Sequence, residues 1–392
     1  MHKISEAQTH LHKNHIDGWL LFDFHRRNHF ACQFLEIPEE THLTRRFFYW
    51  IPREGDPIKI VHAVESSVLD HLPGAKKIYQ TWESFDQALR EVLQDKKVIA
   101  MEYSPRNRIP YVSLVDAGLV ELIRESGVQV VSSGAFLQHF TCVWNKRQLE
   151  LHLEAANHLN QIVNQTWKWI GHNLQNKRKF SEYDVQQFIL NEIVSGDCIT
   201  EGAPICAVNA NAADPHYSPS PKTSFQVKYG DFILIDLWCK KKQKDAVYAD
   251  IARVAVLAPK ASPQQEEIFQ VVRRSQKKAL DFLEASLQKG KVVKGYEVDR
   301  VCRKEIEDAG YGKYFIHRTG HNIHTDVHGP GANLDSFETL DERPLIAKTC
   351  FSVEPGIYLP GQFGVRLETN VYIDESGKIQ VTGGIQDKMV CI

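Results

Sequence analysis

Residues 231–256 read DFILIDLWCKKKQKDAVYADIARVAV, and this stretch decides the fold of the second half of the chain. A continuous apolar run, typical of a buried strand, leads directly to Asp236, and a second strand carries Asp250 in its middle. The lysine-rich segment 240–245 predicts a solvated turn between the strands. We therefore expect a hairpin in which the two aspartates occupy facing positions.

Acids recur at strand ends near the C-terminus. Glu354 follows the apolar run FSV and precedes a Pro-Gly pair. In the segment GVRLET, alternation places Val365 and Leu367 on one face and Arg366 and Glu368 on the other. Buried carboxylates repel one another unless a proton or a cation separates them, so these acids indicate a shared site.

Between the two pairs of acids lies a histidine-rich segment, 317–328. Four carboxylates and one neutral imidazole carry a charge of about −4, which two divalent cations would balance. Oxygen and imidazole ligands without thiolate suit Mn²⁺, Co²⁺ or Zn²⁺. A single acid at a strand end is more often a helix cap or a surface residue, and a single histidine in a glycine-bearing loop is more often structural. Together they indicate a metal-assisted hydrolase without naming a substrate.

Composition excludes several other classes of protein. The chain has 392 residues, 43% of them apolar and 24% charged, and a net charge of −2 spread along its length, so we expect no nucleic-acid partner. No apolar run has the roughly 18 residues that a membrane span needs, and the N-terminus does not resemble a signal peptide. The eight cysteines are scattered, which favours reduced thiols and a cytoplasmic location.

The first 140 residues alternate between strand and helix patterns, and the remainder mixes long helices with strands. Strands are expected at 18–24, 46–51, 58–64, 98–102, 128–131, 231–238, 247–257, 349–358 and 364–374, and helices at 4–15, 82–94, 110–126, 146–173, after Ser181, after Pro263 and at 297–309. The expected fold is an α/β N-terminal domain, a mixed sheet with flanking helices, at 1–143 and an α+β domain at 144–392.

At these residues the sequence resembles the pita-bread metallopeptidases, the family of methionine aminopeptidase, aminopeptidase P and prolidase. The matching fragments follow the order of the family: Ile235-Asp236, Ala249–Arg253, Gly320-His321, Val353–Tyr358 and Gly364–Glu368. The resemblance covers about 150–392, and the preceding residues resemble the creatinase-type N-terminal domain.

The resemblance implies a site. It assigns the metal ligands as Asp236, Asp250, His321, Glu354 and Glu368, with Asp236 on one metal, Asp250 and Glu368 bridging, and His321 and Glu354 completing the second. It implies that Glu354 also handles the proton of the attacking water. It assigns substrate contacts to His216, His317, His328, Tyr358 and Arg366, with the three histidines in catalytic roles. Arg366 either anchors a substrate carboxylate or holds Tyr358 in place.

Some positions depart from the family pattern. Asp236 and Asp250 are 14 positions apart, more than is usual, which we attribute to the lysine-rich turn. Trp238, Lys348 and Arg318 stand where the family commonly has glycine, and Thr369 replaces an acid. None of these changes removes a ligand, but they leave the substrate preference open.

The function implied is hydrolysis of the Xaa-Pro bond in dipeptides or short peptides by a hydroxide that bridges two metal ions, with Mn²⁺ preferred. The modest length favours an Xaa-Pro dipeptidase over an Xaa-Pro aminopeptidase. Two alternatives stay open: a metal-independent amidinohydrolase of the creatinase type and a non-catalytic binding module on the same fold. The resemblance further implies a homodimer.

Overall fold

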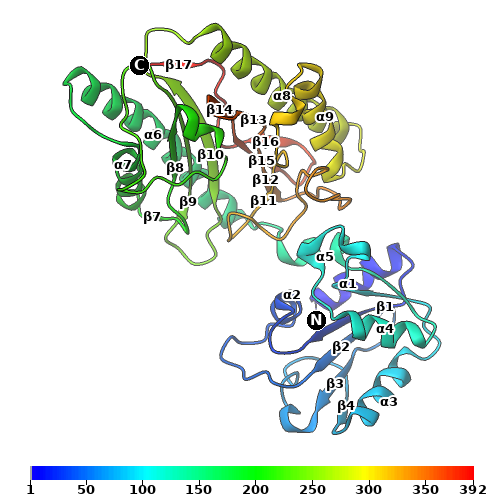
Figure 1. Cartoon of the computed structure of the whole chain (residues 1–392). Helices are drawn as coiled ribbons and strands as arrows, with labels where there is room; N and C mark the ends of the chain where they lie inside the picture. The colour runs from blue at the N-terminus through cyan, green and yellow to red at the C-terminus, as the bar shows by residue number, and fades with distance from the viewer. Residues whose placement is uncertain (1) are drawn as a thin grey trace. The chain divides into compact units, whose positions relative to one another are not determined.

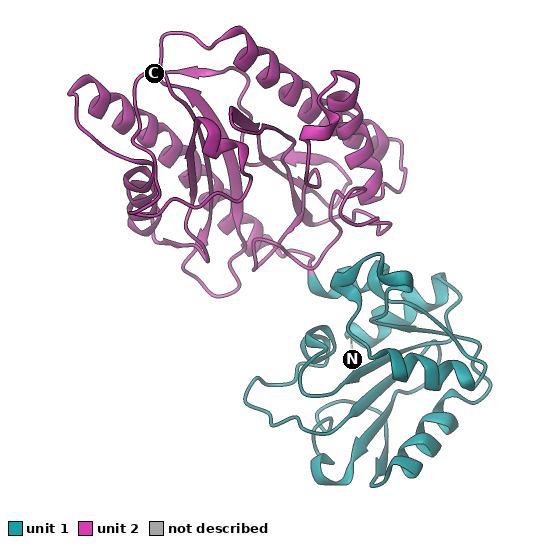
Figure 2. Cartoon of the chain, in the orientation of Figure 1, with its two compact units in different colours: residues 1–141 teal, residues 142–392 magenta. Residues whose placement is uncertain are grey.

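The computed structural model describes residues 2–392 and divides into two compact units, Met1–Thr141 and Cys142–Ile392 (Figure 2). The expected domains, 1–143 and 144–392, stay predictions, because a compact unit is not by itself an independently folding domain. Among residues 2–392, no helix combines the length and the apolar content that crossing a membrane requires.

Unit 1 is built on a mixed sheet of six strands in the order β4-β3-β2-β1-β5-β6. The strands are β1 (Gly18–Asp23), β2 (Phe47–Pro52), β3 (Ile58–His62), β4 (Ala75–Tyr79), β5 (Val98–Met101) and β6 (Gln129–Ser132). β1, β2 and β3 pair antiparallel, and the outer strands β4, β5 and β6 join in parallel. The expected hairpin between β2 and β3 is confirmed.

Helices cover both faces of this sheet (Figure 1). Trp19 and Leu21 of β1 pack against α1 (His2–Lys13), α2 (His29–Phe34) and α5 (Gly134–Thr141). Leu20 and Phe22 face the other way, against α3 (Trp82–Leu93) and α4 (Ala117–Glu125). The alternation of the strand therefore buries both faces, and the α/β expectation for this unit is confirmed.

The helix expected at 110–126 is wrong in its first half. Pro110 opens a single 3-10 turn, and the α-helix begins only after Asp116. Between them, the backbone N–H groups of Leu114 and Val115 donate to the carbonyl oxygen of Glu102 at 2.9 and 3.2 Å. These donors are bound to the end of β5, so they cannot continue a helix.

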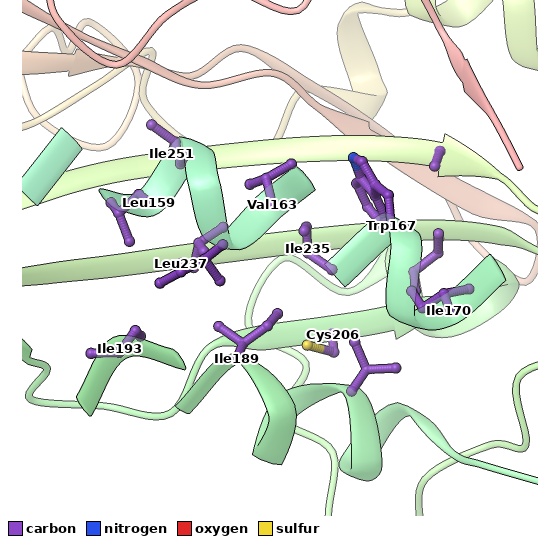
Figure 3. Close-up of a cluster of buried hydrophobic side chains, with 14 of the residues drawn as sticks. Leu159, Val163, Trp167, Ile170, Ile189, Ile193, Cys206, Ile235, Leu237 and Ile251 are labelled. Atoms are coloured by element: carbon purple, nitrogen blue, oxygen red, sulfur yellow. The ribbon is translucent and has the colours of Figure 1, made fainter. Parts of the chain in front are cut away.

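The first half of unit 2 is a sheet covered by two helices. The sheet runs β17-β10-β9-β7, with β8 also paired to β9. Its strands are β7 (Cys198–Ile199), β8 (Ile205–Val208), β9 (Phe232–Lys241), β10 (Ala249–Val256) and β17 (Val390–Cys391), and its helices are α6 (Lys146–Gln175) and α7 (Glu182–Ser195). Figure 3 shows apolar side chains of both helices packed on strands β8, β9 and β10.

The long helix α6 buries one apolar face. Leu159, Ile162 and Val163 lie in this core, whereas Leu153 is 42% exposed. The neighbouring His152 is fully buried. The next helix begins after Ser181, as predicted, and Ser181 and Asp184 exchange hydrogen bonds at its start.

The second half of unit 2 places two helices beside two smaller sheets (Figure 1). The helices are α8 (Pro263–Gln288) and α9 (Gly295–Asp308). One sheet has the order β11-β12-β15-β16, and β13 pairs with β14 as a separate hairpin. The strands are β11 (Asn322–Ile323), β12 (Thr349–Val353), β13 (Gly356–Leu359), β14 (Phe363–Arg366), β15 (Thr369–Ile373) and β16 (Ile379–Val381).

The prediction of two continuous strands at 349–358 and 364–374 is wrong, because each segment forms two separate strands. β12 pairs with β15 and β13 pairs with β14, so the pairing partner changes at Pro355 and again at Leu367. Proline has no N–H to donate to a ladder, which ends β12 there. The breaks leave Glu354 and Glu368 in the gaps between paired strands.

Candidate metal centre

The five predicted ligands meet in one cavity of about 230 Å³. Asp236 comes from the middle of β9 and Asp250 from the start of β10. His321 directly precedes β11, Glu354 follows β12, and Glu368 precedes β15. The structure thus brings together side chains from both halves of unit 2, although their roles as ligands stay predictions.

The sequence predicts that the two aspartates occupy facing positions. This prediction is wrong, because they are not directly opposite each other. Asp236 pairs with Ala252, and Asp250 pairs with Trp238. They lie on the same face of the sheet but are offset diagonally by two residues. The turn that joins β9 to β10 sets this register, which the alternation of each strand leaves undetermined.

The carboxylates and the imidazole are within reach of a shared ion. Nε2 of His321 lies 3.3 Å from Oε1 of Glu354 and 3.6 Å from Oδ2 of Asp250. Ligand atoms of Asp250, His321 and Glu368 all lie within 4.8 Å of one another. All three residues are buried.

Three carboxylate oxygens in this cluster are buried without a hydrogen-bond partner among residues 2–392: Oδ1 of Asp236, Oδ1 of Asp250 and Oε1 of Glu368. Burial, and then the neighbouring carboxylates, raise the pKa values of Asp250 and Glu368 well above the usual range. Burial also raises the pKa of Glu354 to about 7. Buried acids of this kind need a proton or a cation, so the donor set fits divalent ions.

Burial lowers the pKa of His321 well below its ordinary value, which keeps the ring neutral and able to bind a metal. Ser352 connects this histidine to Glu354. Its hydroxyl accepts from the backbone N–H of His321 at 2.9 Å and donates to Oε1 of Glu354 at 2.8 Å. Ser352 therefore orients two of the predicted ligands at once.

Arg366, Tyr358 and His317 form a chain of hydrogen bonds on one side of the cluster. Arg366 donates to the carboxylate of Asp236 and, at 2.8 Å, to the hydroxyl of Tyr358. That hydroxyl lies 2.8 Å from Nε2 of His317. Tyr358 is buried and does not line the cavity, whereas Arg366 and His317 do. Arg366 was expected either to anchor a substrate carboxylate or to hold Tyr358 in place, and the structure shows the hydrogen bond to Tyr358.

His216 and His328 line the cavity and are both partly open to solvent. The ring of His328 lies edge-on to that of His321, with centroids 4.3 Å apart at 82°. Partial burial, and then the charge of Arg318, lower the pKa of His328. The three histidines and Arg366 thus share the cavity with the five ligands.

The departures from the family pattern have different consequences. Trp238 and Arg318 line the cavity. Lys348 adopts a left-handed backbone with φ of 63°, the conformation that glycine takes most readily. The hydroxyl of Thr369 is buried without a hydrogen-bond partner.

Several residues around the site belong to no recognisable motif, and they were not predicted from the sequence as site residues. Ser352 was detectable, because alternation along β12 places it on the same side as Glu354. Gln276 of α8 reaches two strands that are distant in sequence, so no local pattern points to it. Ile205, Pro215, Val327 and Glu338 complete the cavity wall, and they too arrive from separate segments.

These features define the class of protein as one with a buried candidate cation site. Carboxylate oxygens and an imidazole line this site, and they come from strands of unit 2 and from the residues next to those strands. Comparison with known proteins gives its family. The chain belongs to Metallopeptidase family M24, whose profile matches residues 150–375. The expected resemblance and the pita-bread fold of unit 2 are thereby confirmed.

Relatives in this family include the Xaa-Pro dipeptidases of Lactobacillus delbrueckii subsp. lactis and Pyrococcus furiosus. They are 37% and 32% identical over 164 and 178 residues, which are 42% and 45% of this chain. The alignments span only 40% and 46% of those relatives, so less than half of each is matched. Among solved structures, the dipeptidase PepE from Mycobacterium ulcerans has a TM-score of 0.69 at 20% identity, covering 100% of this chain and 97% of that one.

Proposed function

We propose that the protein is a metal-dependent Xaa-Pro peptidase and that it acts as a dipeptidase in preference to an aminopeptidase. The observation that carries the proposal is the set of buried carboxylate oxygens of Asp236, Asp250 and Glu368, which have no hydrogen-bond partner. They face a common cavity with His321 and Glu354. The matched relatives named Xaa-Pro dipeptidase support the substrate class.

Two divalent ions would be held by the predicted ligands Asp236, Asp250, His321, Glu354 and Glu368, with Mn²⁺ our first choice and Co²⁺ or Zn²⁺ as alternatives. When bound, such ions supply Lewis acidity and a water-derived nucleophile at neutral pH. Glu354 takes a proton from the attacking water at its carboxylate, which Ser352 holds in place.

The proline side of the substrate is recognised by shape. An Xaa-Pro bond is a tertiary amide without an N–H, so a hydrogen bond to that group is impossible. His317 lines the cavity beside Arg366. Nδ1 of His317 bonds the carbonyl oxygen of Arg318 at 2.7 Å, and Nε2 bonds Tyr358. With both ring nitrogens engaged, His317 presents a fixed wall to the proline ring.

His328 is positioned to move a proton. Its lowered pKa leaves the ring neutral near pH 7, when one nitrogen donates and the other accepts. It lies against His321, next to the predicted ligands. We assign His328 to stabilising the tetrahedral oxygen or passing a proton to the proline nitrogen, and His216 to contacting the substrate from the cavity mouth.

The test is hydrolysis by the purified protein supplied with Mn²⁺. We expect cleavage of an Xaa-Pro dipeptide, faster than cleavage of the matching Xaa-Pro-Yaa tripeptide, and about two metal ions per chain. Asp236→Asn and Glu368→Gln should each lose at least 100-fold in kcat/KM, as expected when a group of this kind is removed. Asp281→Asn is a matched control, since its exposed carboxylate pairs with Lys277 on α8.

Three results contradict the proposal. Undiminished activity in Asp236→Asn would refute the ligand assignment. Hydrolysis of an amidino compound by protein that holds no metal would favour the amidinohydrolase alternative. Absence of both metal and hydrolysis would favour a binding module.

We further propose a homodimer, a creatinase-type fold for the N-terminal unit and a cytoplasmic location. The last is supported by the cysteines, all eight of which are free thiols, seven of them buried. Light scattering coupled to gel filtration measures the mass in solution, which should be twice that of the 44.9 kDa chain.

A further inference from the structure

Asp236 has different neighbours on its two sides along β9, which we call the hairpin flank and the Trp238 flank. Because side chains alternate along a strand, Leu234, Asp236 and Trp238 point the same way. Leu234 packs in a cluster with Ile357 and Val365 of the β13–β14 hairpin. Trp238 packs instead against a cluster that contains Tyr248 and Ile323. The predicted ligand Asp236 therefore lies between a hairpin flank and a Trp238 flank.

The hairpin flank holds Tyr358, whose hydroxyl lies 2.8 Å from Nε2 of His317, the residue that we assign to the proline ring. Arg366 and Tyr358 belong to β14 and β13, and Arg366 donates to Asp236 from that side. Trp238 lies about 7 Å from Asp236 in the opposite direction along the strand. The two residues joined by the scissile bond have Cα atoms about 3.8 Å apart. A substrate whose proline faces the hairpin thus extends its other residue toward Trp238.

The Trp238 flank is apolar. Trp238 lines the cavity from β9, Ile205 from β8 and Val327 from the loop after β11. Ile205 is the ladder partner of Asp236, and Trp238 is the partner of Asp250, so both side chains share the ligands' face of the sheet. Placing a charged side chain against these three would cost free energy unless another group paired with it.

The indole of Trp238 cannot retreat to enlarge this space. A Cβ atom built on Gly202 would lie 3.0 Å from Cζ2 of the indole, so the ring rests directly against the backbone of Gly202. The same cavity must also hold the proline ring. The indole therefore limits the size of the side chain that fits beside it.

We propose that Ile205, Trp238 and Val327 form the pocket for the residue before proline, and that this pocket takes a medium-sized aliphatic side chain. The inference rests on the proposed function and specifies its substrate. Leu-Pro and Ala-Pro are predicted to be preferred, with Phe-Pro excluded by the indole and Asp-Pro by its charge.

The experiment measures kcat/KM for these four dipeptides with the full-length, metal-loaded protein. In the wild type we expect Leu-Pro to exceed both Phe-Pro and Asp-Pro by at least tenfold. Trp238→Ala should raise the ratio of Phe-Pro to Ala-Pro by at least tenfold, and Trp238→Phe should raise it by less. Trp82→Ala is the control, because that indole is 68% exposed in unit 1 and should leave every ratio unchanged.

Binding provides a second readout that does not depend on turnover. Calorimetry with the reduced-amide analogues of Leu-Pro and Phe-Pro, which cannot be hydrolysed, should show the same preference and its loss in Trp238→Ala.

If Trp238→Ala does not fold, the comparison is made with Trp238→Phe. Unchanged ratios in a folded variant, or a wild-type preference for Phe-Pro or Asp-Pro, would overturn the pocket assignment. Selective binding of the analogues without any hydrolysis would refute the proposed function and leave the pocket assignment standing.

Discussion

At the residue scale, Arg366 holds together two parts of the site. Its guanidinium is 3% exposed and donates to Asp236, to the hydroxyl of Tyr358 and, at 3.3 Å, to the carbonyl oxygen of Pro215. Burial alone would lower its pKa, but Tyr358 and the surrounding carboxylates raise it well above the usual value. The charge is therefore permanent, and the planar fork serves several acceptors at fixed angles.

Replacing Arg366 with lysine should disable the site without unfolding the protein. A single ammonium group cannot reach both Asp236 and Tyr358 in the geometry of the fork, so one buried oxygen loses its donor. We expect kcat/KM on an Xaa-Pro dipeptide to fall at least tenfold, about 1.4 kcal/mol of transition-state stabilisation. Arg274→Lys, at an exposed pair with Glu305, is the control. Full activity in Arg366→Lys would show that charge alone suffices.

At the scale of elements, helix α8 fixes the two strand ends that carry Glu354 and Glu368. The side-chain amide of Gln276 donates to the carbonyl oxygens of Val353 at 3.0 Å and Leu367 at 2.9 Å. Each of these residues directly precedes one of the acids. One buried amide thus sets the spacing between two predicted ligands at the ends of the neighbouring strands β12 and β15.

Gln276→Met should loosen this arrangement. It removes one hydrogen bond from each of two carbonyl oxygens, which costs about 1 kcal/mol each in the free energy of unfolding. We expect a lower urea midpoint and weaker metal binding, the latter measured by competition with a chelator. Gln288→Met, at the exposed end of the same helix, should alter neither quantity. A variant that lost stability but bound metal as tightly as the wild type would restrict Gln276 to a structural role.

At the scale of the whole molecule, buried histidines make the stability of unit 2 depend on pH. His152 of α6 lies 2.7 Å from the carbonyl oxygen of Tyr248 and 2.6 Å from the hydroxyl of Thr382, so it joins three distant segments. Burial lowers its pKa to about 4. The unfolded chain then binds more protons than the folded one between about pH 6.5 and pH 4, so stability falls as the pH drops through that window.

We compare the free energy of unfolding at pH 7.5 and pH 5.0 in the wild type and in His152→Gln by urea denaturation of the intact protein, because the raised pKa values of Asp250 and Glu368 act in the opposite direction and cancel in that comparison. His152→Gln has no proton to gain, so its loss of stability between the two pH values should be smaller than that of the wild type by about 2 kcal/mol. His172→Gln, exposed on the same helix, should behave as the wild type. Identical losses in His152→Gln and the wild type would exclude His152 as a source of the pH dependence.

Local sequence patterns predict most of the helices and strands and the chemical character of the site. Alternation in the segment around Glu368 places Arg366 and Glu368 in the cavity and Val365 and Leu367 in the core, as predicted. Helices α6 to α9 follow from apolar spacing and local caps. These features depend on residues within a few positions of one another, and local spacing therefore suffices to predict them.

The pairing of the strands and their register depend on contacts that the folded chain alone reveals. The tertiary structure offset Asp250 from Asp236, broke the expected strands at Pro355 and Leu367, and placed Tyr358 behind the cavity instead of in its wall. It also brought Gln276 and Trp238 to the predicted ligands. A pairing partner is chosen by contacts between segments far apart in the chain, and no local period of the sequence contains that choice.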